Sequence, residues 1–306
     1  MVTPMTQTRK RSAKIHRTRA DRVFDALLYA ISLVILIIII YPLYFIIVAS
    51  FSNPSAVTGG KVWFWPVGFT LDGYKALLEA PQLWTGYGNT ILYAAAGTFI
   101  ALVFNIPAAY ALSRKDLYGR RILNVFFLIV MFFSGGLIPT FLVVQQVGLY
   151  NTFWVMVLPF SISIYNIMIA RTFFDTSLPG DLHDAAQMDG CNNLRFFFQI
   201  VIPLSKAIIA VIALWTAIGH WNSYFNALIY LRDPWRRPLQ LVLRNILITN
   251  QRIFAVTTGE AALEAVRKAN LLRYTSIIVS TVPILAIYPF AQKYFAQGVM
   301  IGAVKG

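Results

Sequence analysis

The sequence predicts an all-α membrane protein with six transmembrane helices. Its 306 residues are 58% hydrophobic and only 12% charged, and the mean hydropathy is +0.64. Soluble domains carry about 25% charged residues. Five intervals contain no Asp, Glu, Lys or Arg, and each is long enough for the roughly 20 apolar residues that cross a bilayer. These intervals run from Asp25 to Lys61, from Glu79 to Arg114, from Arg121 to Arg171, from Lys206 to Arg232 and from Arg273 to Lys293.

The third interval has room for two helices, so six helices are expected in all. We place them at residues 24–50, 86–112, 122–146, 152–173, 204–230 and 274–292. The first apolar run is too long for the core of a signal peptide, and no small-residue cleavage site follows it closely, so it should remain as a membrane anchor. Residues 1–23 are then a basic tail, residues 24–293 the six-helix domain, and residues 294–306 a C-terminal tail.

Charge in the loops predicts the orientation of these helices. The N-terminal tail holds seven Lys or Arg residues between positions 9 and 22, which places it in the cytoplasm by the positive-inside rule. Six spans return the C-terminus to the same side, and the basic loop 113–121 also falls inside. The long loop 231–273 carries eight Lys or Arg against three acidic residues but falls outside, in conflict with its charge. Because long loops count less in this rule, we keep the topology.

What the sequence lacks argues against several function classes. Gly60-Lys61 is followed by Val62 and has no upstream glycine of a P-loop, so ATP binding of that kind is not expected in this chain. The predicted helices hold no acidic or basic residue in their middle, where ion-coupled carriers generally need one. The single cysteine, Cys191, allows no internal disulfide and suggests no metal site. The net charge of +14 lies mostly in the tail and the long loop, which favours contact with anionic lipid over nucleic acid.

Neutral polar and aromatic residues recur at membrane depth. They suit the lining of a sugar path, because amides and hydroxyls bond sugar hydroxyls and flat rings pack on sugar faces. They equally suit hydrogen bonding and packing between helices, which is ordinary in membrane bundles. His220 has no carboxylate on its own helix and is interpreted as a buried hydrogen-bonding residue. The candidates are Asn105, Tyr165, Asn166, Trp215, His220, Trp221, Asn222 and Tyr224.

A polar segment, residues 177–203, interrupts the apolar helices. It predicts a short helix with Pro179 in its first turn and Gly190 in the left-handed conformation that ends it. Leu182, Ala185 and Ala186 are spaced to share one face, where two alanines leave room for another protein. An ordinary amphipathic surface helix would have the same periodicity.

The spacing of this segment resembles the EAA signature of permease subunits of binding-protein-dependent ABC importers. The matched run is Asp184-Ala185-Ala186, three residues, Gly190, nine residues, and Ile200-x-Ile202-Pro203, with Asp189 before the glycine. Asp184 stands where the family commonly has Glu, and Ile202 where it often has Leu. Trp221-Asn222, Ala227-Leu228 and the ending Gly302 to Gly306 look like the carbohydrate branch, of the maltose type and nearest to complex-polysaccharide permeases. The resemblance runs from about residue 24 to the last residue.

The resemblance implies a type I ABC importer permease in the bacterial cytoplasmic membrane. It would pair with a homologous second permease and two ABC ATPase subunits, which bind ATP and Mg, and would receive an oligosaccharide from an extracytoplasmic sugar-binding protein. The cytoplasmic coupling loop, residues 174–203, would dock on an ATPase through Asp184, Ala185, Ala186, Asp189, Gly190 and Pro203. Gly302, Lys305 and Gly306 would also reach the ATPases. The chain itself would be no enzyme and would hold no catalytic residue, cofactor or metal.

Two other classes stay open on the residues alone. A secondary sugar carrier would need an ion pathway, and a membrane-embedded glycan-modifying enzyme would need catalytic carboxylates or histidine near an interface. The excess of Arg and Lys in the loop 231–273 could steer an acidic oligosaccharide or complement an acidic binding protein.

Overall fold

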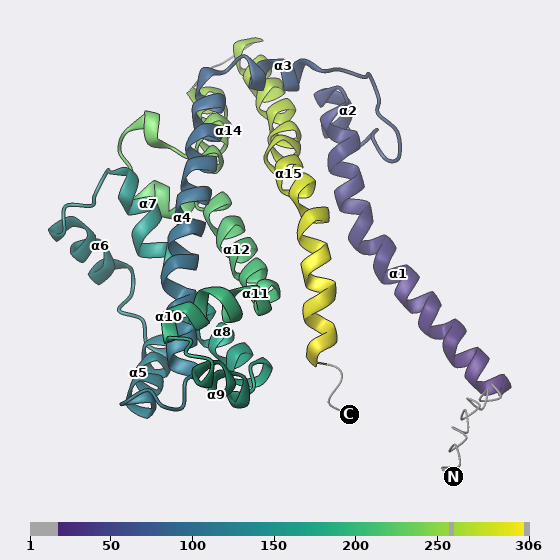
Figure 1. Cartoon of the computed structure of the whole chain (residues 1–306). Helices are drawn as coiled ribbons and strands as arrows, with labels where there is room; N and C mark the ends of the chain where they lie inside the picture. Colours follow the sequence, from purple (N-terminus) through teal and green to yellow (C-terminus); the bar gives the residue numbers. More distant parts are fainter. Residues whose placement is uncertain (1–17, 257–259, 303–306) are drawn as a thin grey trace.

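The computed structural model describes residues 18–256 and 260–302, and within these ranges the chain forms helices and connecting loops without a β-strand (Figure 1). The helices are α1 (Arg19–Ser50), α2 (Pro54–Thr58), α3 (Asp72–Leu78), α4 (Pro81–Ser113), α5 (Arg120–Phe132), α6 (Leu137–Gln146), α7 (Phe153–Ser161), α8 (Ile164–Ser177), α9 (Gly180–Met188), α10 (Asn193–Phe196), α11 (Ile202–Leu204), α12 (Lys206–Trp221), α13 (Tyr224–Tyr230), α14 (Leu239–Val256) and α15 (Glu260–Gly302). A π-helical turn, Phe197–Val201, joins α10 to α11, and a short 3-10 turn, Pro234–Arg236, precedes α14.

Three unbroken helices are long and apolar enough to cross a membrane. They are α1, α4 and the part of α15 from residue 269 to residue 289. The other predicted spans are bent pairs: α5 with α6 at 111°, α7 with α8 at 41°, and Asn193–Leu204 with α12 at 79°. Counting each pair as one span gives up to six, in line with the prediction. The expected single helices at 122–146, 152–173 and 204–230 were therefore wrong as continuous elements.

Each break has a local physical cause. Gly136 between α5 and α6 has φ +83°, a conformation that glycine adopts without steric cost. Ile162 and Ser163 between α7 and α8 are extended, and the Ser163 side chain caps α8 by accepting from the Asn166 N–H. Ser205 between α11 and α12 leaves the helical conformation, at φ −105° and ψ 18°. The predicted helix 204–230 is interrupted once more at the end of α12, where the Ser223 hydroxyl donates to the His220 carbonyl at 2.6 Å. Hydropathy reports the length of an apolar run and does not report such interruptions.

The predicted long loop 231–273 is mostly helical. α14 fills its first half and packs into the bundle through Leu239, Leu241, Val242 and Leu243, which are all buried. Its start is fixed to α4, since the Leu239 N–H donates to Thr90 Oγ1 at 2.8 Å and Tyr93 Oη donates to the Arg236 carbonyl. Thr90 lies nine residues into α4, about 14 Å along the axis at 1.5 Å per residue. The segment therefore folds back along the bundle.

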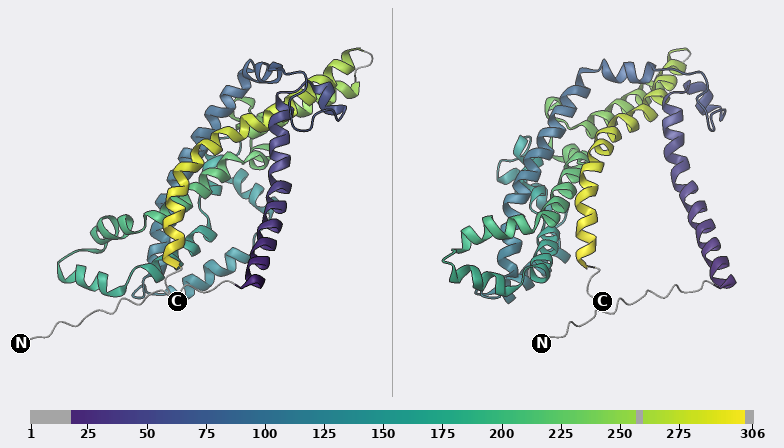
Figure 2. Two further views of the ribbon diagram at one scale, coloured as in Figure 1. Left: turned by 90° about the vertical axis from the view of Figure 1, so that its right-hand side faces the viewer. Right: turned by 45° about the vertical axis from the view of Figure 1, so that its right-hand side comes forward.

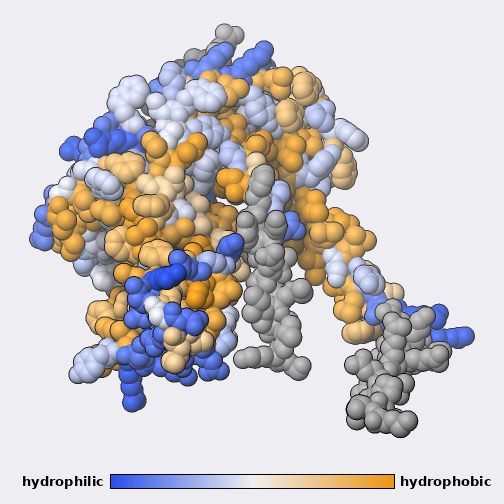
Figure 3. All heavy atoms as spheres, viewed as in Figure 1, coloured by the Kyte–Doolittle hydropathy of each residue, from blue (hydrophilic) through white to orange (hydrophobic). Residues whose placement is uncertain are grey.

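α1 stands apart from most of the bundle. Thr18 and Asp21 form a capping box, so the helix begins at Arg19, five residues before the predicted start. Its buried residues are Val48, Ala49 and Ser50 at its far end, close to α15. Figure 2 shows α1 diverging from α15 in both views. Apolar residues dominate the exposed surface along α1 and over the middle of the molecule (Figure 3).

The two ends of the molecule differ. α2 and α3 lie at one end, and α5 and α9 lie at the other, together with the start of α1 and the last turns of α15 (Figure 1). Hydrophilic residues gather around α9 at this second end (Figure 3). We call it the α9 end.

Candidate functional site

The polar segment forms α9 with a well-defined end. Gly190 has φ +75°, its N–H donates to the Gln187 carbonyl, and the Cys191 N–H donates to the Ala186 carbonyl, both at 2.9 Å. This pair of bonds is a Schellman motif, which confirms the expected left-handed glycine. Pro179 was expected inside the first turn but is extended, at φ −60° and ψ 140°, and immediately precedes the helix.

The two alanines of α9 point in different directions. Ala186 is buried in a hydrophobic cluster with Phe174 of α8 and Phe196 of α10, and the half-buried Leu182 packs against the same cluster. Ala185 is exposed, and Met188 is 89% exposed. The expected shared face of Leu182, Ala185 and Ala186 is therefore divided, because the chain's own core takes Leu182 and Ala186. The outward face consists of Asp181, Asp184, Ala185 and Met188.

His183 holds α9 against the following helix and was missed in the sequence. Its ring is buried, packs edge-on against Phe196 with 5.0 Å between centroids, and places Nε2 3.2 Å from Asn193 Oδ1. Gln187, one turn along α9, lies 3.4 Å from the same nitrogen. A histidine four residues before a glutamine was a usable signal, since residues at this spacing are neighbours on a helix.

A cleft of about 610 Å³ opens beside α9, between it and the α4–α5 connection. Asp175 of α8 lines this cleft and accepts a hydrogen bond from Arg120 at 3.0 Å, and Arg120 also donates to the Leu112 carbonyl at 3.0 Å. The Arg114 guanidinium donates to both oxygens of Asp116 at 2.8 Å and so holds the pKa of that carboxyl below its usual range. The outer wall of the cleft includes Asp181 and Asp184. The α9 end thus presents fixed charges of both signs around an exposed helix.

Asn105, His220 and the α7–α8 break form one buried network in the centre of the bundle. Asn105 Nδ2 donates to the Ser161 carbonyl at 3.1 Å, and its Oδ1 accepts from the Ser163 N–H at 3.3 Å. Asn105 thereby pairs backbone groups that the break leaves without helical partners. Ser161 Oγ donates to the Val157 carbonyl and lies 3.2 Å from His220 Nε2, which assigns that nitrogen as the donor.

Gly97 makes room for the His220 ring. A Cβ atom on Gly97 would lie 2.0 Å from His220 Nε2. The two helices α4 and α12 therefore meet where one has no side chain and the other has a ring. Asn105 is fully buried and His220 is 4% exposed, so both join helices and neither lines a path in this structure.

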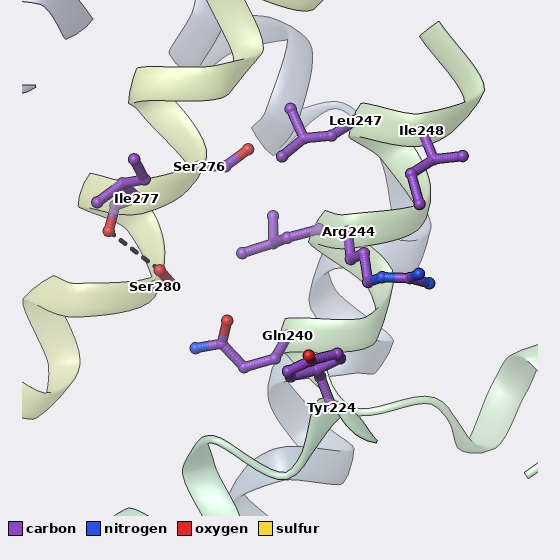
Figure 4. Close-up of a pocket in the computed structure, with 9 residues that line it drawn as sticks. Tyr224, Gln240, Arg244, Leu247, Ile248, Ser276, Ile277 and Ser280 are labelled. Carbon is purple, nitrogen blue, oxygen red and sulfur yellow. Dashed lines mark hydrogen bonds between the residues drawn. The ribbon is translucent and has the colours of Figure 1, made fainter. Parts of the chain in front are cut away.

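The other candidates for a sugar path fall into two groups. Asn166 and Trp221 are buried, and Trp221 Nε1 donates to the Ser280 carbonyl at 3.0 Å, which ties α12 to α15. Tyr165, Trp215, Asn222 and Tyr224 are exposed. Tyr165 and Trp215 stack with 6.3 Å between ring centroids, while Asn222 is bonded to the Ile218 carbonyl one turn back. Tyr224 lines a pocket between α13, α14 and α15 (Figure 4).

The remaining predicted coupling residues lie near the surface. Asp184, Asp189, Gly190 and Pro203 are exposed. Gly302 is the last residue of α15, and Lys305 and Gly306 lie outside the described residues. Within residues 18–256 and 260–302, no group of three or more His, Cys, Asp or Glu residues is arranged to hold a metal ion.

Comparison with known proteins identifies relatives of this chain. No family model matches the chain. It is 38% identical over 292 residues to the protein LplC of Bacillus subtilis (strain 168), covering 95% of this chain and 98% of that protein. It is 36% identical to the polygalacturonan/rhamnogalacturonan transport system permease protein YtcP of the same strain, covering 94% of this chain and 99% of YtcP.

A solved structure supports the same assignment. A chain in the crystal structure of a bacterial ABC transporter involved in the import of the acidic polysaccharide alginate superposes with a TM-score of 0.81 at 32% identity. The match covers 92% of this chain and 99% of that one. The chain is thus an integral protein of the bacterial cell membrane, and it belongs to the family of permease subunits of ABC transport systems for sugars and oligosaccharides.

Proposed function

We propose that this chain is one of two permease subunits of an ATP-driven importer, and that α9 couples it to an ATPase partner. The observation that carries the proposal is the construction of α9. Its inner face is fixed by Ala186, His183 and the Gly190 turn, while Ala185 and Met188 are exposed on its outer face. A rigid helix with a small, partly apolar outer face fits a cleft of another protein.

The cargo is an oligosaccharide delivered by an extracytoplasmic binding protein. YtcP is a permease of a polygalacturonan/rhamnogalacturonan transport system, and this similarity supports a polysaccharide fragment as cargo. The exposed apolar surface of α1, α5 and α6 supports a homologous second permease as partner in the bilayer. Asp184, Ala185, Asp189 and Gly190 would touch one ATPase, and Gly302, Lys305 and Gly306 would extend that contact.

Uptake measurements test the class of transporter. In proteoliposomes that contain both permeases, the ATPases and the binding protein, uptake should require internal ATP and persist when a protonophore collapses the proton gradient. The control omits the ATPases and should show no uptake. Uptake by the permeases alone, driven by a proton gradient, would instead identify a secondary carrier.

Cys191 offers a native probe of orientation and docking. It is the only cysteine in the chain, it is a free thiol, and it is partly exposed directly after Gly190. We expect a membrane-impermeant maleimide to label it from the cytoplasmic side only, and bound ATPase to slow the labelling, because the thiol lies beside the proposed contact.

A cysteine at the opposite end is the matched control. Ser55→Cys in a Cys191→Ser background places an exposed thiol on α2, and it should be labelled from the outside with or without ATPase. Labelling of Cys191 from outside would reverse the proposed topology. Labelling from inside at a rate that ATPase does not change would remove the docking site from this part of α9.

A further inference from the structure

Arg244 is a positive charge inside an apolar helix. The segment Leu239–Thr249 is an apolar stretch of α14, and the residues on its inner face are buried in the bundle. Ionisable residues in such surroundings are rare and usually serve a function. Within the described parts of the chain, no carboxylate or other group forms an ion pair or hydrogen bond with Arg244. By contrast, Arg114, Arg120 and Arg171 each pair with an aspartate.

Arg244 lines a pocket of about 460 Å³ between α13, α14 and α15. This volume lies in the range of small-molecule sites, roughly 300 to 1,000 Å³. The polar side chains of the lining are Tyr224 from α13, Gln240 and Arg244 from α14, and Ser276 and Ser280 from α15. In Figure 4, Gln240 points from α14 toward α15, whereas the Arg244 guanidinium points away from α15, at the other side of the pocket lining.

Ser276 supplies a second, independent indication of a ligand. Its side chain is 3% exposed, and its Oγ atom has no hydrogen-bond partner among the described residues. Leaving a buried hydroxyl without a hydrogen-bond partner is unfavourable. Ser280 donates to the Ile277 carbonyl at 3.0 Å and keeps its acceptor capacity. The wall formed by α15 therefore offers hydrogen-bonding capacity that the protein itself does not use.

The combination of groups identifies the ligand chemistry. A guanidinium binds a carboxylate through two parallel hydrogen bonds. An amide and two hydroxyls bond sugar hydroxyls, and the 43% exposed Tyr224 offers an aromatic face to a sugar ring. Leu247 and Ile248 complete the wall with apolar surface. A uronate residue carries hydroxyls and one carboxylate on a single ring, so it offers a partner to each of these kinds of group.

We propose that this pocket is a subsite for one uronate residue of an acidic oligosaccharide on the import path, with Arg244 bound to the carboxylate. The inference rests on the proposed function, since the sugar must reach the pocket through the assembled importer. It assigns part of the cargo selectivity to this permease, at residues from α13, α14 and α15.

Uptake of two cargoes of equal length tests the subsite in the complete importer. The probes are trigalacturonate and its carboxyl-reduced, neutral counterpart. Arg244→Gln should lower uptake of trigalacturonate at least about tenfold, a loss of roughly 1.4 kcal/mol, and change uptake of the neutral trisaccharide less than twofold. Arg244→Lys, which keeps the charge, should recover part of the loss. Arg232→Gln is the control, because Arg232 is exposed and lies outside the pocket.

A direct measurement of sugar binding to the permease complex does not depend on the extracytoplasmic binding protein. Calorimetric titration of trigalacturonate into the purified complex without binding protein should show at least about tenfold weaker binding for Arg244→Gln and no change for Arg232→Gln. Equal binding of trigalacturonate by the native and Arg244→Gln complexes would overturn the subsite. Loss of the second permease from the purified variant would also overturn it, because Arg244 would then be an interface residue.

An anionic lipid headgroup is the other source of the same negative charge. A defect of Arg244→Gln seen only in liposomes with phosphatidylglycerol, and absent in pure phosphatidylcholine, would assign the pocket to lipid and overturn the proposal. Failure of the proposed function has a different signature. In that case the native complex shows no ATP-dependent uptake of either trisaccharide, whatever residue stands at position 244.

Discussion

Replacing Gly97 with leucine should prevent the permease from assembling in an active form. A Cβ at this position would lie 2.0 Å from Nε2 of the His220 ring, which is buried and bonded to Ser161. Overpacking a core costs about 1 to 3 kcal/mol per site and more for a large side chain. We expect the yield of folded protein and its transport to fall at least about tenfold, since 1.4 kcal/mol corresponds to a factor of ten. Size-exclusion chromatography and uptake assays measure both.

Two comparisons make this test specific. Gly88→Leu on the same helix is the control, because a Cβ there meets no atom within 4 Å. Gly97→Ala should be destabilising in the native background and nearly neutral in a His220→Ala background, where the ring is absent. This double-mutant cycle isolates the contact. If Gly97→Ala has the same effect in both backgrounds, the ring does not limit the approach of α4 and α12.

Replacing Gly190 with proline should uncouple transport from ATP hydrolysis. Proline fixes φ near −65°, against +75° here, and removes the N–H that donates to the Gln187 carbonyl. The end of α9 would unwind and its outer face would lose its fixed position. We expect uptake to fall at least about tenfold, which corresponds to a loss of about 1.4 kcal/mol in the free energy of docking between α9 and the ATPase. The chain should still insert and pair with its partner permease.

Gly190→Asn is the matched control, because asparagine visits the left-handed region at low cost. It should keep most of the uptake and the stimulation of ATPase activity by the loaded binding protein. Gly60→Pro tests for a general effect of proline, since Gly60 has φ +66° and lies at the opposite end of the molecule. If Gly190→Pro keeps stimulated ATPase activity and uptake at native levels, α9 is not the coupling element.

The fold could be predicted from the sequence as far as hydropathy reaches. The long charge-free intervals place α1 and α4 within a few residues, because membrane thickness determines the length of a span. The three bends depend on local groups such as Gly136 and Ser163, whose effect is set by tertiary contacts. α14 was assigned to a loop because its charges suggested an exposed segment, while its packing depends on Thr90 and Tyr93, about 150 residues earlier.

The candidate site could be predicted only where it depends on local sequence. Turn chemistry is local, so the left-handed Gly190 was found correctly. The direction of a side chain depends on its neighbours, so Ala186 was expected outside and lies in the core. Asn105 and His220 belong to a buried network that joins three spans, and only their coordinates distinguish such a network from a sugar path. Arg244 was counted as one loop charge among eight, because its pocket forms only when α14 and α15 pack.

The placement of Ala186 has a mechanical consequence. The hydrophobic cluster around it also contains Ile106 of α4, Phe174 of α8 and Ile212 of α12. Protein cores are packed as densely as organic crystals and are hard to compress. A force applied at the exposed Met188 would therefore produce little local deformation and would displace three membrane helices together. α9 would act as a rigid lever arm, so that the work done on it appears as rotation of the bundle and is not stored as elastic strain.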